Sequence, residues 1–443
     1  MSFLTDKQTL TDLNILGKYV NNSIFSIFNE VQTIGGEKLL DKLFHEPLSE
    51  PRKINKRSQL FRFFQDGKYQ FPVDNEDFTI AEQYLNHTDY PNSFTAWFNT
   101  VRIRLLLHIG LDKEYRVMEQ GLEATIRVLK DMAGFIKEVE SSTKENLYTE
   151  NCDILSKILN DKQLYWIYDY TAEKRISLFK FAKYDHAIRY SLKNEMNRLL
   201  NIIYEIDVFT AVAQVAEKKG FNYAEADEKD KNYLLFEGLF HPGIKDAIDN
   251  NIHFYKDRNV VFLTGANMAG KSTLMKAIGA ANYLAHMGFP VPAKKMQFSV
   301  KDGIFTSINV PDNLNMGYSH FYAEVLRVKS VAQEVASNKH LLIIFDELFK
   351  GTNVKDAYEA TVAITDAFSK KINSTFIIST HIMEAGEALK DKENNIQFLF
   401  LPTEMDGVTP IYTYKLKEGI TDDRHGMIII NNEKILEIIN GEY

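Results

Sequence analysis

One short segment of the chain combines glycines and a lysine at a spacing suited to binding phosphate. Residues 265–273 read GANMAGKST, and we call this segment the glycine loop. An apolar run at 260–263 precedes it, and residues 273–287 have the composition of a helix. A glycine turn between strand and helix directs backbone N–H groups and the helix dipole at a polyphosphate. The pattern predicts that Lys271 binds the β- and γ-phosphates and that Ser272 ligates Mg²⁺.

Two adjacent carboxylates end a second apolar run. Residues 341–345 read LLIIF, which is typical of a buried strand, and Asp346 and Glu347 follow directly. If this strand lies beside the glycine loop, Asp346 would reach the Mg²⁺ ion. Glu347, one residue further along, would then be placed to polarise an attacking water. Adjacent acids also end strands by chance, and it is the glycine loop upstream that favours the catalytic interpretation.

A histidine follows a third apolar run. Residues 375–378 read TFII, and Ser379, Thr380 and His381 come next. A histidine at this place could contact the γ-phosphate or the attacking water and so report on the nucleotide. The alternative is a histidine that only caps the next helix. Together with the glycine loop and the acid pair, the pattern favours a functional histidine.

Two further segments allow two interpretations each. Ser319 precedes a predicted helix at 320–338 and suits an N-cap, although Tyr322 stands where a full capping box needs Glu or Gln. This is either an ordinary helix start or a helix N-terminus directed at the γ-phosphate of a partner subunit. The polar turn at 351–356 is either a connector or a loop that contacts a second subunit.

Prolines and apolar periodicity divide the chain into two halves. No proline lies between Pro91 and Pro242, and apolar residues recur at helical spacing over 192–206. The polar segment 223–231 has the composition of a linker. After it, short apolar runs alternate with helical stretches, which predicts an α/β domain with a mainly parallel sheet. We therefore expect a multidomain α and α/β protein, with an all-helical domain at 1–232 and the α/β domain at 233–443.

Composition excludes several classes of protein. The chain has 443 residues and a net charge of −8, which argues against a uniformly basic nucleic-acid-binding surface. Basic residues cluster at 52–62, where a solvated helix face is the simpler interpretation. The single cysteine, Cys152, permits neither an internal disulfide nor a cysteine-based zinc site. Residues 1–10 lack a secretory pattern and no apolar run is long enough for a bilayer. We expect a cytoplasmic protein without a membrane segment.

The motifs together resemble the MutS DNA mismatch-repair ATPase family, a branch of the ABC-type ATPases. Residues 264–273 are similar to the family's TGPNMGGKST, and 346–352 to its D-E-x-x-x-G-T. Residues 379–381 resemble its switch histidine motif. Residues 314–324 resemble its L-x-x-G-x-S-T-F-M-x-E signature, which meets ATP across a dimer. In the first half, the segment at 33–48 resembles the start of the family's helical core.

The resemblance implies a helical core and lever domain followed by an ABC-type P-loop ATPase domain. It implies ATP and Mg²⁺ as cofactors, DNA as a partner bound mainly through its backbone, and a homodimer formed by the ATPase domains. An alternative is a nucleotide-gated module whose helical half binds a protein and not DNA. The implied catalytic residues are Glu347, His381 and Lys271. The implied nucleotide contacts are Gly265, Asn267, Met268, Gly270, Lys271, Ser272, Thr273 and Ser319, and the implied metal ligands are Ser272 and Asp346.

The sequence also departs from the family pattern. Few residues precede the core motif, so the mismatch-binding and connector domains are expected to be absent and the DNA clamp reduced. Ala266 and Ala269 replace Pro and Gly in the glycine loop, and His320 and Tyr322 replace Thr and Met in the signature. The resemblance is faint between about residues 66 and 175, for which no contact is predicted.

Overall fold

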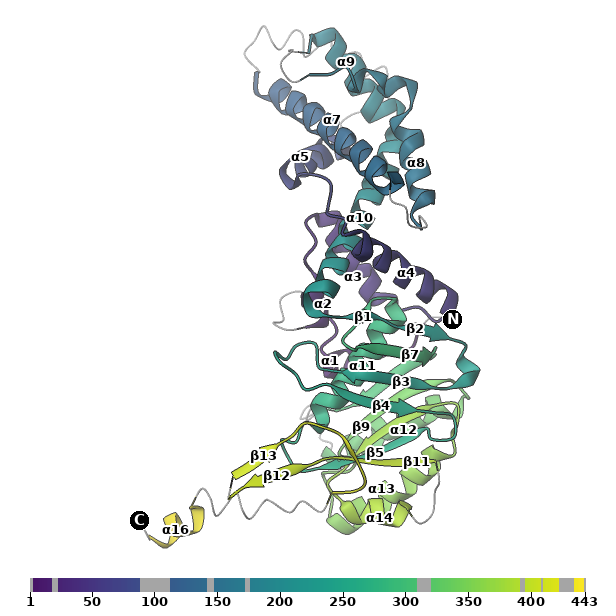
Figure 1. The fold of residues 1–443 in the computed structure, drawn as a ribbon, viewed down its shortest axis with the longest axis vertical. Helices are drawn as coiled ribbons and strands as arrows, with labels where there is room; N and C mark the ends of the chain where they lie inside the picture. Colours follow the sequence, from purple (N-terminus) through teal and green to yellow (C-terminus); the bar gives the residue numbers. More distant parts are fainter. Residues whose placement is uncertain are drawn as a thin grey trace. The chain divides into compact units, whose positions relative to one another are not determined.

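The computed structural model describes most of the chain, in nine stretches. The described residues are 3–17, 23–87, 112–141, 147–171, 176–308, 320–390, 395–407, 409–421 and 434–441. Packing divides the chain into two compact units (Figure 1). The first unit comprises Met1–Phe28, Leu43–Ser58 and Val215–Tyr443, and the second comprises Asn29–Lys42 and Gln59–Gln214.

These units differ from the consecutive domains expected at 1–232 and 233–443. Two N-terminal pieces pack with the sheets of the first unit, because their apolar side chains are buried there. The ring of Phe28 lies 5.4 Å from that of Phe289, and the ring of Phe44 lies 5.5 Å from it. Apolar contact thus assigns these residues to the α/β unit, although their position in the sequence is far from it.

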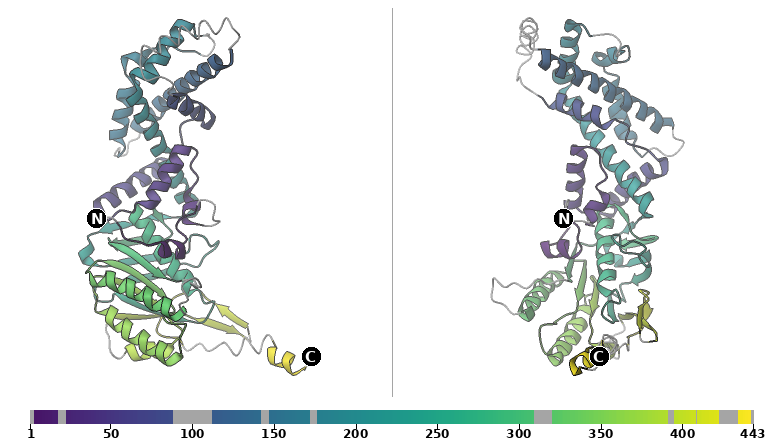
Figure 2. Two further views of the ribbon diagram at one scale, coloured as in Figure 1. Left: turned by 180° about the vertical axis from the view of Figure 1, so that it is seen from behind. Right: turned by 90° about the vertical axis from the view of Figure 1, so that its left-hand side faces the viewer.

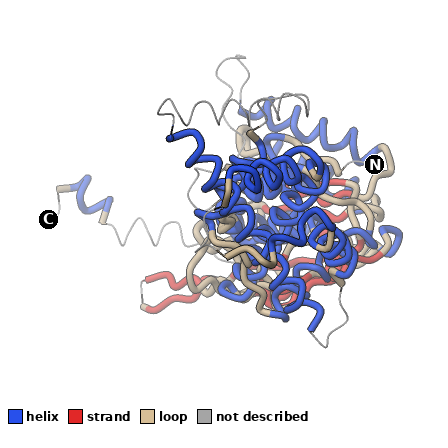
Figure 3. The backbone as a smooth tube through the Cα atoms, turned by 90° about the horizontal axis from the view of Figure 1, so that it is seen from above, coloured by secondary structure: helices blue, strands red, loops and turns tan. Residues whose placement is uncertain are grey.

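The described residues of the second unit form helices and no strands, drawn in blue in Figure 3. Their core is apolar side chains repeated at helical spacing, such as Leu122, Ile126, Leu129 and Ile136 on α7. Helices α3, α4 and α10 each contribute part of their length to this unit. The helices are α3 (Ile34–His45), α4 (Pro51–Gly67), α5 (Asn75–Asn86), α7 (Asp112–Ser141), α8 (Thr149–Leu159), the 3-10 helix η1 (Lys162–Ile167), α9 (Leu178–His186), the π-helix η2 (Ala187–Ser191) and α10 (Lys193–Lys219).

Helix α10 follows the periodicity that the sequence shows. The apolar residues that recur at helical spacing are buried, namely Leu192 just before α10 and Met196, Leu199, Ile203 and Ile206 on it. The helix ends before Gly220, whose φ is +67°. Among the described helices it alone is long and apolar enough to cross a membrane, but 72% of its most apolar window is buried inside the structure. Its apolar residues therefore serve packing within the protein.

The first unit is built on a six-stranded sheet of order β14-β11-β5-β10-β9-β8, which we call the main sheet. All neighbours in it are parallel except β14. The strands are β5 (Val260–Gly265), β8 (Gly303–Ser307), β9 (Leu341–Asp346), β10 (Thr375–Ser379), β11 (Ile396–Leu401) and β14 (Lys417–Glu418). The mainly parallel sheet and its three predicted apolar strands are thus confirmed.

Helices cover both faces of the main sheet, which makes its central strands apolar throughout. Alternate residues of β5, β9 and β10 share a core with α12 (His320–Ala336), α13 (Val354–Ser369) and α14 (Met383–Lys390). Figure 2 shows α13 and α14 side by side. The opposite face meets α11 (Lys271–Met287), where a Cβ added to Gly279 would lie 3.3 Å from Cδ1 of Ile344.

A second sheet of order β2-β7-β3-β4 and two short pairs, β1-β6 and β12-β13, complete the unit. The expected linker at 223–231 is wrong, since Tyr223 pairs with Pro290 and Ala226 with Phe298. The strands are β1 (Asn222–Tyr223), β2 (Glu225–Asp227), β3 (Leu234–Leu239), β4 (Asn250–Phe254), β6 (Pro290–Val291), β7 (Lys295–Ser299), β12 (Thr403–Asp406) and β13 (Thr409–Tyr412). The remaining helices are α1 (Lys7–Asp12), α2 (Ile24–Phe28), the 3-10 helix η3 (Lys229–Lys231) and α16 (Ile435–Asn440).

Candidate nucleotide-binding site

The carboxyl ends of β5, β10 and β9 lie next to one another and carry most of the predicted site residues. In the register of β10, Ser379 is opposite Leu263 on β5 and opposite Asp346 on β9. Backbone bonds continue past the strand ends, from Glu347 N to Ser379 O at 2.9 Å and from Thr380 N to Leu263 O at 3.2 Å. Strand register therefore brings the acid pair and the histidine motif to the glycine loop.

The glycine loop has the backbone conformation that its glycines permit. Gly265 and Gly270 have φ values of 145° and 100°, and Met268 has a φ of 69°. A Cβ on Gly265 would lie 3.0 Å from the carbonyl oxygen of Leu401, so a larger residue would be strained there. Helix α11 begins at Lys271, and its first N–H groups have no partner within the helix. The loop and helix start therefore have the form that the sequence predicts for an anion site.

Lys271 lies across the glycine loop. Its Nζ donates to the carbonyl oxygens of Gly265 at 2.8 Å and Ala266 at 3.1 Å. Burial lowers the pKa of this lysine, while the charges of Glu347 and Asp346 oppose the shift. An ammonium held by two neutral carbonyls is available to a stronger acceptor, so an anion in the loop would compete for it.

Ser272 and Asp346 place side by side a hydroxyl oxygen and a carboxylate, two groups that can ligate a metal ion. The Oγ of Ser272 donates to Oδ2 of Asp346 at 2.5 Å. The other carboxylate oxygen of Asp346, Oδ1, is buried without a hydrogen-bond partner among the described residues. A buried carboxylate oxygen without a partner is costly, and a hard cation would satisfy it. A hydroxyl and one carboxylate fit Mg²⁺, which keeps several of its own waters.

Both carboxylate oxygens of Glu347 contact a basic side chain. Its Oε1 contacts Nε2 of His381, and its Oε2 lies 2.6 Å from Nζ of Lys350. The hydrogen bond with His381 lowers the pKa of Glu347 to about 2, and Lys350 adds to this shift against the effect of burial. The backbone of Glu347 is left-handed, with a φ of 53°. Glu347 is therefore an anion across the neutral range, with its carboxylate aimed by its two partners.

Two residues beside the glycine loop were not singled out from the sequence. One is Lys350, which pairs with Glu347. The other is Tyr414, whose ring would lie 3.0 Å from a Cβ on Gly270. Next to Tyr414, a polar cavity of about 480 Å³ is lined by residues that include Asn250 and Lys415. In the sequence, Tyr414 is only one aromatic residue between β13 and β14. Its nearness to the glycine loop depends on the fold.

The other predicted site residues that the structure describes do not share the hydrogen bonds and ion pairs given above. Asn267 and Met268 are exposed at the tip of the loop, and Thr273 lies in the first turn of α11. Ser319 lies outside the described residues. The turn at 351–356 packs on the start of α12, because a Cβ on Gly351 would lie 2.7 Å from the backbone nitrogen of Phe321.

One member of the basic cluster at 52–62 has a structural role. Nη1 of Arg57 donates to the carbonyl oxygen of Met287 at 2.9 Å, at the end of α11. Ser58, which lies within the same stretch, donates to the carbonyl oxygen of Gly288 at 3.1 Å. These contacts hold α4 against the end of α11 within the first unit.

Comparison with known proteins agrees with this geometry. Residues 261–440 match the family model of MutS domain V. The DNA mismatch repair protein MutS of Brevibacillus brevis is 30% identical over 251 residues, which is 54% of this chain and 28% of that protein. The same-named proteins of Bacillus subtilis (30% over 238 residues, 52% and 27%) and Petrotoga mobilis (28% over 266 residues, 58% and 32%) are also similar. Each match thus spans less than a third of the relative. Residues 261–440, which carry the glycine loop, the acid pair and His381, are a domain V of the MutS family.

Proposed function

We propose that this chain is a MutS-like ATPase, related to mismatch repair, which couples the binding and hydrolysis of Mg·ATP to DNA binding. One observation carries the proposal: Lys271, the Ser272–Asp346 pair and the Glu347–His381 pair meet at the carboxyl ends of β5, β9 and β10. Relatives over this region are named DNA mismatch repair proteins, which supports the cellular role.

Binding would use the glycine loop and the start of α11. Backbone N–H groups of the loop would hold the phosphates, and Lys271 would exchange its two carbonyl partners for phosphate oxygens. The ring of Tyr414 would offer a surface for the base beside Gly270. Asn267 and Met268 are exposed at the tip of the glycine loop, and they would contact the nucleotide from its solvent-facing side.

Ser272 and Asp346 would hold Mg²⁺ through the serine hydroxyl and the carboxylate oxygen Oδ1. When bound, the ion supplies positive charge that offsets the negative charge on the β- and γ-phosphate oxygens. Ser272 would then no longer donate to Asp346, so its hydroxyl oxygen becomes a ligand. The Oγ of Ser272 already lies 2.5 Å from Oδ2 of the same carboxylate, so little rearrangement of the two side chains is needed.

Glu347 and His381 would act on the attacking water. Phosphoryl transfer depends more on position and charge than on a strong base. A carboxylate with a pKa of about 2 suits that requirement, because it stays ionised and orients water as an acceptor. His381, bonded to the same carboxylate, would complete the water's position and contact the γ-phosphate.

The remaining parts of the proposal concern the assembly. The helical second unit would respond to the nucleotide state and contact DNA mainly through its backbone. Two chains would meet through their ATPase domains, where Ser319 would act on the partner's ATP. A cytoplasmic location, which the single cysteine favours, belongs to the same proposal.

The test is ATP turnover by the purified chain with and without duplex, mismatched and branched DNA. Turnover that requires Mg²⁺ and rises with DNA is expected. Lys271→Ala should abolish nucleotide binding and turnover together. Absence of turnover in the wild-type chain would defeat the enzymatic part of the proposal. Turnover that ignores every DNA would leave an ATPase whose helical unit binds a protein.

A further inference from the structure

Strand β8 forms one edge of the main sheet, and residues 3–15 cover it. We call these residues the N-terminal strap. The backbone nitrogen of Leu4 donates to Asp302 O at 2.8 Å, and Ile304 N donates to Leu4 O at 2.9 Å. An edge strand otherwise presents unpaired N–H groups that invite pairing with another chain. The strap starts to close this edge with one strand-like bridge.

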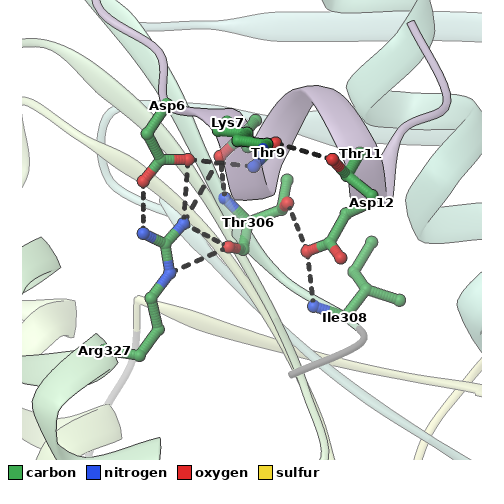
Figure 4. A network of polar contacts seen from close by, with 8 residues as sticks. All are labelled: Asp6, Lys7, Thr9, Thr11, Asp12, Thr306, Ile308 and Arg327. Carbon is green, nitrogen blue, oxygen red and sulfur yellow. Dashed lines mark hydrogen bonds and ion pairs between the residues drawn. The ribbon is translucent and has the colours of Figure 1, made fainter. Parts of the chain in front are cut away.

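Side chains of α1 continue the closure along β8. Thr306 N donates to Oγ1 of Thr9 at 3.0 Å, and Ile308 N donates to Oδ2 of Asp12 at 2.9 Å (Figure 4). The same oxygen of Asp12 accepts from the hydroxyl of Thr306 at 2.7 Å. Thr9 and Asp12 are three residues apart, so they lie on one face of the helix. They replace the partner strand that β8 lacks on this side.

Arg327 links this closure to α12. Its Nε and Nη2 donate to the carbonyl oxygen of Thr306 at 3.1 and 2.5 Å, and its guanidinium pairs with the carboxylate of Asp6 (Figure 4). Asp6 is also the N-cap of α1, accepting from Thr9 N at 2.9 Å. The Arg327 side chain is only 10% exposed. One guanidinium thus ties the strap, the edge strand and α12 together.

The strap also packs against α11, the helix that follows the glycine loop. A Cβ on Gly279 would lie 2.5 Å from Cδ2 of Leu13, so the glycine allows close approach. The ring of Phe3 lies 4.5 Å from that of His286. The strap therefore fixes β8, α11 and α12 through one segment of chain.

The first turn of α12 contacts the loop that carries Glu347. The ring of Phe321 lies 5.9 Å from that of Phe349, edge to face. A Cβ on Gly351 would lie 2.7 Å from Phe321 N, so backbone meets backbone there. Phe349 has a left-handed φ of 65°, which this contact helps to maintain. Any shift of α12 would reach Glu347 through this contact.

We propose that the N-terminal strap is a positioning element for ATP hydrolysis, in which Asp6, Asp12 and Arg327 are positioning residues. They act by fixing α12, whose first turn sets the loop that holds Glu347. The inference rests on the proposed function and adds a second, distant control of the same site. Asp6, Asp12 and Arg327 act on β8 and α12, whereas Lys271 and Ser272 lie on α11, so loss of these three side chains should affect turnover more than ATP affinity.

The first test compares Arg327→Met with Lys329→Met in the full chain. Lys329 is exposed on the same helix, so its variant matches the loss of charge without touching the strap. Arg327→Met is expected to lower kcat roughly tenfold, with the Kd for ATP within about twofold of wild type. Lys329→Met is expected to match wild type. Hydrogen exchange should quicken over 304–308 and 347–352 in Arg327→Met alone.

Three results would overturn the inference: wild-type kcat in Arg327→Met, a parallel loss of kcat and ATP affinity, or unchanged exchange over 347–352. A wild-type chain without turnover would instead defeat the proposed function, so the two failures are distinguishable.

A second pair guards against a variant that merely fails to fold. Asp12→Asn keeps an oxygen that can accept from Ile308 N–H and the Thr306 hydroxyl, whereas Asp12→Ala removes it. Asn should retain most of kcat and Ala should lower it roughly tenfold, with ATP binding kept in both. Equal turnover in the two variants would contradict a positioning role for Asp12.

Discussion

At the scale of single residues, Glu347 is held in a way that limits its chemistry. His381 and Lys350 occupy both of its carboxylate oxygens and lower its pKa to about 2. Such a weak base gains little by accepting a proton near neutral pH. Its contribution must come from orienting water and from its charge, which the neutral amide of glutamine cannot supply.

We predict that Glu347→Gln keeps ATP affinity and lowers turnover by about 10² or more. The amide retains the size of the side chain, so the glycine loop and Lys271 should still bind nucleotide. Equilibrium binding of ATP and steady-state turnover measure the two effects separately. Turnover at the wild-type rate would remove Glu347 from the mechanism.

Lys301 is a buried lysine that the sequence analysis did not single out. Its Nζ donates to Oδ1 of Asn232 at 2.5 Å and to Oγ1 of Thr375 at 2.8 Å, and the residue is fully buried. Burial lowers its pKa to about 7, while Asp302 opposes the shift. Between this pKa and the ordinary value of 10.5, the unfolded chain binds the proton and the folded chain does not. The free energy of unfolding should therefore rise with pH in that window.

We predict that Lys301→Met removes this rise, which reaches at most about 1.4 kcal/mol per pH unit for one group. Urea unfolding of wild type and variant between about pH 7 and 9 measures the difference in slope. Lys329→Met serves as the exposed control and should keep the wild-type slope. Parallel curves for wild type and Lys301→Met would show that Lys301 keeps its proton state on folding.

Motif spacing was enough to predict Lys271, Ser272, Asp346, Glu347 and His381, because each follows an apolar run that forms a central strand. Their proposed roles await the experiments above. Lys350 and Tyr414 could not be found in this way. Their importance depends on which loop lies opposite the glycine loop, and no local pattern encodes that neighbour.

At the scale of elements, the sequence predicted the central strands and helices but not their order. Apolar runs alternating with helical stretches are enough to predict a parallel sheet. That β10 lies between β5 and β9 depends on how each crossover returns to the sheet. The short strands β1 and β2 were missed because they overlap the segment 223–231, whose run of charged residues after Ala226 indicated a linker and hid the buried Tyr223 and Ala226.

Gly134 offers a test of the helical unit at this scale. It lies within α7, and a Cβ added there would meet nothing within 4 Å. Glycine inside a helix is less stable than alanine by roughly 0.5–1 kcal/mol. We predict that Gly134→Ala raises the free energy of unfolding by about that amount, as measured by urea denaturation.

Gly351→Ala is the matched variant in the α/β unit. Its Cβ would lie 2.7 Å from a backbone nitrogen, which cannot move aside as a side chain can. This second substitution should therefore destabilise the chain. A loss of stability in Gly134→Ala would mean that α7 is more closely packed at this position than the structure shows.

At the scale of the whole molecule, the two compact units are not consecutive along the chain. The pieces Met1–Phe28 and Leu43–Ser58 join the α/β unit through contacts with residues more distant in sequence, such as Phe289. Local patterns predicted α10, α11 and α12 but carry no information on such partners. The division expected at residue 232 followed composition, which changes there, whereas the packing of the N-terminal pieces is decided by long-range apolar contact.

The net charge of −8 bears on how a chain of this kind could bind DNA. A polyanion is repelled by the molecule as a whole, so binding must come from a local group of lysines and arginines on phosphates. Each neutralised phosphate contributes about −0.9 to the slope of log affinity against log salt. We predict that DNA stimulation of turnover falls steeply between about 50 and 200 mM salt, with equal slopes for matched and mismatched duplexes. The prediction is checked by measuring DNA affinity and DNA-stimulated turnover across this range of salt concentration. A shallow slope with preference for the mismatch would mean that bases are read directly, and that backbone contact is the wrong description.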